Sequence, residues 1–165
     1  MEPNSRIIAL DPGGTTGWAT HSWFQVDEET YDRSWACGQL SGDHHNDLDV
    51  LLGNQHLHRY TIICESFQQY RELDSPELVA LEYIGVVKRF SQERNVKLIF
   101  QSSSQGKIGT SSFVRRRNLE RLGLWSSGRR HAMDAYGHLL TYMINRAASS
   151  AARKYRLDLL EQGWK

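Results

Sequence analysis

The residues of this sequence best suited to chemistry are a few acids beside apolar segments. Asp11 and Glu65 each end a short apolar run, and Asp134 lies three residues after His131. If the two runs are parallel neighbouring strands, Asp11 and Glu65 project from the same edge of one sheet, where open α/β folds place their sites. Residues three apart share a helical face, so a helix would place His131 beside Asp134.

Such carboxylates predict a metal site. Unpaired carboxylates beside apolar runs carry a desolvation penalty unless a cation neutralises them. Oxygen ligands suit Mg²⁺ or Mn²⁺, which bind through a few carboxylates and phosphate oxygens. Two such ions, about 4 Å apart, can activate a water and stabilise the leaving oxygen of a phosphodiester. The implied reaction is hydrolysis of a nucleic-acid backbone. Taken singly, Asp11 could cap a turn, Glu65 could be an ordinary strand-end acid, and His131 could merely contact its own helical turn.

Charge is distributed unevenly along the chain, although the net charge is only +1. Residues 1–87 hold 4 Lys and Arg against 14 Asp and Glu, a net charge of −10, and residues 88–130 hold 11 against 2, a net charge of +9. This polarity predicts a polyanion partner, most simply nucleic acid, and a solvated charged surface is the alternative.

Basic and aromatic side chains near the acids are the candidates for DNA contact. Those expected to neutralise phosphates are Lys107, Arg115, Arg116, Arg117, Arg121, Arg129 and Arg130. Phe67 and Tyr70 follow Glu65 and could stack on unpaired bases, or instead pack onto the sheet or a dimer partner.

The elements that must position these residues follow from hydrophobic patterning. Three runs rich in β-branched residues predict buried strands, at residues 7–10, 61–64 and 96–100. Two segments between the first and second run, residues 18–24 and 34–40, predict a hairpin. Three segments have apolar residues at helical spacing: 46–59, 75–94 and 130–151. The predicted fold class is α/β, a mixed sheet flanked by helices.

Several local features complete the expected layout. The turn at residues 11–17 has three glycines that can take positive φ, and residues 102–112 resemble a mobile loop. His138 is expected to be buried, whereas the histidines without coherent ligand spacing are expected at the surface: His44, His45, His56 and His58. Cys37 and Cys64 are expected to be reduced thiols.

The length and composition of the chain limit the number of domains and the class of protein. The chain has 165 residues, 39% of them apolar, and a mean hydropathy of −0.56. We expect a single domain over residues 1–165, with a helical or mobile tail from about residue 150. No run approaches the roughly 18 apolar residues of a membrane span, and the first residues are unlike a signal peptide. We therefore expect no membrane partner and a cytoplasmic location, in a bacterial cell or a phage-infected host.

Three sequence blocks resemble a known family. The segments IIALDPGGTTGWA (Ile7–Ala19), IICES (Ile62–Ser66) and HAMDA (His131–Ala135) are similar to the signature blocks of the RuvC-like Holliday-junction resolvases, in the ribonuclease H-like superfamily. The resemblance implies a ribonuclease H-like mixed five-stranded sheet flanked by helices. It implies that Asp11, Glu65, His131 and Asp134 form the metal-binding catalytic set, with a histidine where many members have an acid. It also implies a homodimer and makes Lys107 similar to a functional lysine of the family.

These features predict a metal-dependent endonuclease that cleaves four-way DNA junctions with two Mg²⁺ or Mn²⁺ ions. A flap or replication-fork nuclease on the same fold stays open, as does a catalytically inactive DNA-binding protein. A phosphotransferase of the actin-like and sugar-kinase kind would need a second phosphate-binding loop and a longer chain. Because a junction has two symmetry-related strands to cut, we expect a two-fold dimer. The expected dimer interface is the helix at 75–94, where Leu78, Leu81 and Val86 would otherwise expose apolar area.

Overall fold

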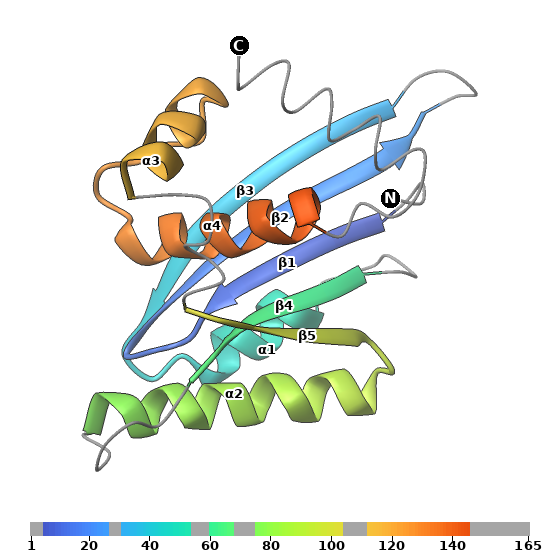
Figure 1. Cartoon of the computed structure of the whole chain (residues 1–165). Helices are drawn as coiled ribbons and strands as arrows, with labels where there is room; N and C mark the ends of the chain where they lie inside the picture. The colour runs from blue at the N-terminus through green and yellow to red at the C-terminus, as the bar shows by residue number, and fades with distance from the viewer. Residues whose placement is uncertain (1–4, 27–30, 54–59, 68–74, 104–111, 146–165) are drawn as a thin grey trace.

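The computed structural model of the chain describes residues 5–26, 31–53, 60–67, 75–103 and 112–145. Within these residues a five-stranded sheet is flanked by helices (Figure 1), which confirms the predicted α/β class. The strands are β1 (Ser5–Asp11), β2 (Thr15–Gln25), β3 (Tyr31–Ser41), β4 (Tyr60–Ser66) and β5 (Lys97–Ser102). The helices are α1 (His45–Gly53), α2 (Ser75–Glu93), α3 (Ser112–Arg121) and α4 (Arg130–Asn145).

The sheet has the order β3-β2-β1-β4-β5 and is mixed. Strand β2 pairs antiparallel with both β1 and β3, forming the predicted hairpin, whereas β4 pairs parallel with both β1 and β5. In the β1–β4 register, Leu10 lies opposite Cys64. The next residues, Asp11 and Glu65, therefore leave the sheet at the same edge, as the sequence predicts.

Each face of the sheet carries its own hydrophobic core, because successive side chains of a strand point to opposite faces. Ile7 and Ala9 of β1 belong to the core that includes α4 and Leu119 of α3. Ile8 and Leu10 belong to the core that includes α1 and α2. Figure 1 accordingly shows α4 on one side of the sheet and α2 on the other.

The helical spacing predicted for the core is confirmed where the structure describes it. On α2 the buried residues include Ala80, Ile84, Val87 and Phe90, and on α4 they include Ala132, Tyr136, Leu140 and Met143. The predicted extensions over residues 54–59 and 146–151 lie outside the described residues, as do residues 104–111 of the predicted loop. Cys37 and Cys64 are free thiols. No helix in the described part of the chain is long and apolar enough to cross a membrane.

One helix was not predicted, and two local predictions were wrong. The run at 96–100, predicted as a buried strand, forms the edge strand β5, and Phe100 is 38% exposed. Helix α3 was not predicted, because its sequence SFVRRRNLER has little apolar periodicity. The turn after β1 does not use the glycines as expected: among the described glycines, positive φ occurs at Gly42 and Gly123. Gly17 is required for space instead, because a Cβ there would overlap the backbone carbonyl group of His131.

The surface placement predicted for His44 is also wrong, because its side chain is fully buried. His44 Nδ1 lies 2.8 Å from the Gly42 carbonyl oxygen, Nε2 lies 2.7 Å from Thr16 Oγ1, and the ring stacks on Tyr83. A buried polar group is tolerated when it is hydrogen-bonded, and both ring nitrogens of His44 have partners. His45 is partly exposed, whereas His56 and His58 lie outside the described residues.

Candidate metal centre

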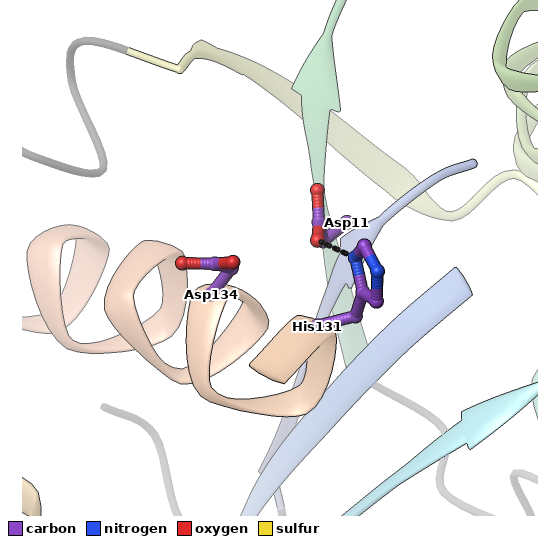
Figure 2. Close-up of side chains that lie close together, drawn as sticks. All are labelled: Asp11, His131 and Asp134. Atoms are coloured by element: carbon purple, nitrogen blue, oxygen red, sulfur yellow. Dashed lines mark hydrogen bonds and ion pairs between the residues drawn. The ribbon is translucent and has the colours of Figure 1, made fainter. Parts of the chain in front are cut away.

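Three of the predicted site residues form a compact group at the carboxyl end of β1. Asp11 ends β1, and His131 and Asp134 lie one turn apart at the start of α4 (Figure 2). One potential ligand atom from each residue lies within 4.8 Å of the others. His131 Nδ1 is 3.1 Å from Asp11 Oδ2, which accepts its hydrogen bond. The Asp11 side chain is 15% exposed and that of His131 44%, so the group is open on the histidine side.

Glu65, the fourth predicted residue, lies beside Asp11 but outside this compact group. Burial raises the pKa of Asp11 to about 8, helped by a hydrogen bond with the Glu65 side chain and by the negative charges of Glu65 and Asp134. The charge of His138 acts in the opposite direction. The structure thus brings all four predicted residues to one edge of the sheet, and their function as ligands stays a prediction.

The donor set fits a divalent cation. Three carboxyl groups converge there, and the pKa of Asp11 is raised by burial and, secondly, by the negative charges of Glu65 and Asp134. A cation would remove this repulsion, and carboxylate oxygens together with one imidazole suit Mg²⁺ or Mn²⁺. The cluster could therefore hold a metal ion.

Contacts with the hairpin fix the first turn of α4, and with it His131. The amide N–H of His131 donates to Gln39 Oε1 of β3 at 3.1 Å, which satisfies one of the free donors at the start of the helix. The missing side chain at Gly17 lets the His131 backbone approach β2. These two contacts set the distance from His131 to the end of β1.

His138 also belongs to the site, which the sequence did not predict. Its burial is confirmed, at 3% exposed, but its Nε2 lies 2.9 Å from Glu65 Oε2 and its Nδ1 lies 2.9 Å from Gln101 Oε1. The available signal was its position one helical turn after Asp134, which placed it on the same face of α4.

Five of the basic residues predicted to contact DNA lie on α3 or directly at the start of α4. Helix α3 is held by the buried Leu119, and the segment that follows it leads into α4. The exposed arginines are Arg116, Arg117, Arg121, Arg129 and Arg130. Arg116 is tied to Glu120 at 2.8 Å and lies over the Trp125 ring.

The structure tests none of the predicted DNA contacts. Phe67 is partly buried and packs against the core on the α2 side, and base stacking by Phe67 stays a prediction. Lys107, Tyr70 and the side chain of Arg115 lie outside the described residues.

Comparison with known proteins finds similarity in structure rather than in sequence. No known protein family and no curated protein matches the sequence. RuvC of T. thermophilus in complex with a Holliday junction substrate has a TM-score of 0.62 at 16% identity, over 83% of this chain and 92% of that chain. A further Thermus thermophilus RuvC structure has a TM-score of 0.59 at 18% identity, with the same coverage. Fowlpox virus resolvase with substrate Holliday junction DNA has a TM-score of 0.50 at 14% identity, over 83% and 95% of the two chains.

These similarities establish the fold. The chain has the fold of T. thermophilus RuvC, and its mixed five-stranded sheet flanked by helices is the architecture implied by the three sequence blocks.

Proposed function

We propose that this protein is a divalent-metal-dependent endonuclease that cleaves four-way DNA junctions. The observation that carries the proposal is the group formed by Asp11, His131 and Asp134, with Glu65 beside it at the carboxyl ends of β1 and β4. The group lies on a fold shared with RuvC, which has been solved with a Holliday junction. A flap or fork nuclease on this fold is the alternative that the substrate test below must distinguish.

In this proposal Asp11, Glu65, His131 and Asp134 hold two Mg²⁺ or Mn²⁺ ions. When bound, the ions supply an activated water and neutralise the charge that develops on the phosphate. The protein contributes rigidity, since Asp11 and Glu65 are carried by paired strands and the other two by a helix packed on them. The exposed side of the His131 ring faces solvent, where a phosphate could approach.

The exposed arginines of α3 and of the segment leading into α4 are proposed to bind the DNA arms. They lie on the chain just before His131 and Asp134, so phosphates bound there would lead toward the acidic group. Neutralised phosphates release counterions, and this electrostatic contribution accounts for much of the affinity of such proteins. Binding and cleavage thus depend on different residues, which makes them separable by substitution.

We also propose that the working species is a homodimer. Two strands of a junction must be cut, and two-fold related sites match the symmetry of that substrate. On α2, Leu78 is 52% exposed and Leu81 38%, so this helix presents apolar surface that a second copy could cover.

The direct test incubates the protein with labelled four-way, three-way, flap and linear DNA in Mg²⁺ or Mn²⁺ and maps the products. We expect paired, symmetrical cuts in the four-way junction. Asp11→Asn, Glu65→Gln or Asp134→Asn should lower cleavage by about 10³-fold or more, because metal stabilisation of the reaction is worth several kcal/mol. Junction binding should persist in all three variants.

Three outcomes would contradict parts of the proposal. Preferential cutting of flaps would favour the alternative substrate, and junction binding without cleavage by the wild type would favour a DNA-binding protein. Near-normal cleavage by any of the three variants would remove that residue from the metal site. His131→Asp should retain substantial cleavage, since a carboxylate can replace imidazole as a ligand. Complete inactivity of His131→Asp would contradict the ligand role.

A further inference from the structure

His138 differs from the other buried residues of α4. The remaining buried side chains in the described part of this helix are apolar or tyrosine, and they pack into the core between α4 and the sheet. Burying an imidazole costs free energy unless its ring nitrogens find partners. Both nitrogens of His138 have partners at 2.9 Å, and one partner is Glu65, a proposed metal ligand.

The contact is assembled from three elements. Glu65 of β4 and Gln101 of β5 are paired in the parallel register, so their side chains leave the same face of the sheet. Helix α4 covers that face and places the His138 ring between them. The Gln101 amide oxygen accepts a hydrogen bond from Nδ1, which fixes the rotation of the ring and directs Nε2 at Glu65 Oε2.

We propose that His138, oriented by Gln101, is a positioning residue that holds the Glu65 carboxylate in the orientation needed for metal binding. The inference rests on the proposed function, because it takes Glu65 as a ligand. Glutamate has several rotatable bonds, and a ligand that must be ordered at the moment of binding loses affinity. Hydrogen bonds to the outer side of a ligand remove this cost, and losing them typically weakens metal affinity or activity by 10- to 100-fold.

Two conservative substitutions separate positioning from simple packing. The amide nitrogen of glutamine reaches the place of Nε2, so His138→Gln keeps a hydrogen bond with Glu65. The shorter His138→Asn reaches only the place of Nδ1, so it keeps the contact with Gln101 and loses the one with Glu65. Both variants are polar and similar in size, so a purely structural role predicts similar effects.

The measurements are the Mn²⁺ affinity of the DNA-free protein, by calorimetry, and the Mg²⁺ concentration that gives half-maximal junction cleavage. We expect both values to rise by about 10- to 100-fold in His138→Asn and to stay within about threefold of wild type in His138→Gln. Gln101→Leu should give an intermediate rise, since the ring then loses its orienting acceptor. Thermal unfolding in EDTA verifies that each variant is folded.

Met143→Ala is the matched control, because Met143 is also buried on α4 but lies more than one turn beyond His138. It should lower the unfolding temperature and leave both metal measurements unchanged. Equal Mn²⁺ affinities for His138→Asn and wild type would overturn the inference, as would equal defects in the Asn and Gln variants. If the wild type binds Mn²⁺ but cleaves no DNA, the proposed nuclease activity is refuted. The Mn²⁺ affinities of the variants would still decide whether His138 positions Glu65.

Discussion

The carboxyl cluster should make the metal-free protein less stable as the pH rises, and Asp11→Asn should remove that loss. Asp11 has a pKa near 8 in the folded protein, against an ordinary value of 3.8, chiefly through burial and secondly through Glu65 and Asp134. Between pH 4 and pH 8 the folded protein therefore holds a proton that the unfolded chain has released. More protons bound to the folded state means that the free energy of unfolding falls as pH rises across this interval.

The size of the effect follows from the shift. One pKa unit corresponds to about 1.4 kcal/mol, so the rise of the Asp11 pKa from 3.8 to about 8 sets an upper limit of roughly 6 kcal/mol by pH 8. Asp11 and Glu65 share a hydrogen bond, so the repulsion is spread over both carboxyls and one substitution recovers only part of it. We expect Asp11→Asn to raise the free energy of unfolding by about 2 kcal/mol at pH 8 and by almost nothing at pH 4.

Urea unfolding in EDTA at pH 4, 6 and 8 would measure this difference between variant and wild type. Taking the difference removes contributions from histidines and other groups that titrate in both proteins. Asp49→Asn is the control, since Asp49 is a half-exposed carboxylate on α1 that pairs with Arg89 at 3.5 Å. Its difference from wild type should be small and nearly constant between pH 6 and pH 8.

Adding Mg²⁺ should reverse the order of stability at pH 8. Wild type gains stability by binding the ion, whereas Asp11→Asn lacks a ligand and gains less. The reasoning would be refuted if Asp11→Asn were no more stable than wild type at pH 8 in EDTA. It would also be refuted if Mg²⁺ stabilised both proteins equally.

Three further predictions concern the surroundings of the site. Gly17→Ala should destabilise the protein by about 1–3 kcal/mol and reduce cleavage, because the new Cβ overlaps the backbone of α4. Gly14→Ala is the control in the same urea unfolding and cleavage assays, because a Cβ at Gly14 meets no atom within 4 Å. Arg117→Gln should reduce the slope of log binding constant against log salt by about 1, whereas Arg89→Gln on α2 should leave it unchanged. Leu81→Glu should convert a dimer to monomers in sedimentation, and a wild type that is monomeric both free and with DNA would contradict the proposed dimer.

The strands and the placement of the two strand-end acids were predictable because they depend on local patterns. Short β-branched runs favour strands, and two of the three predicted runs form the buried central strands β1 and β4, whereas the run at 96–100 forms the edge strand β5. Parallel pairing of β1 and β4 then brings Asp11 and Glu65 to one edge. The face of α4 was predictable for the same reason, since its apolar spacing decides which side packs on the sheet. His131 and Asp134 follow from that face.

The errors occurred where distant residues decide the structure. The burial of His44 depends on Thr16, 28 positions away, whose hydroxyl contacts ring Nε2, and on Tyr83, 39 positions away, whose ring stacks on the imidazole. The partner of His138 on β4 is 73 positions away, so helical spacing predicts its burial but not its contact with Glu65. Helix α3 is a third case: its arginines favour solvent, and the burial of one leucine against another element fixes its place.

These contacts share one consequence, which is that the site depends on how α4 docks on the sheet. The sheet supplies two of the carboxylates in a register fixed by strand pairing, and α4 supplies everything else. Besides the hydrogen bond between His131 and Asp11, three contacts join the helix to the sheet near the site: the close approach at Gly17, the Gln39 cap, and the hydrogen bonds of His138. Because a helix moves as a rigid body, loosening any one of them displaces its metal-ligand side chains together. Cleavage should therefore be more sensitive than global stability to substitutions at these three positions.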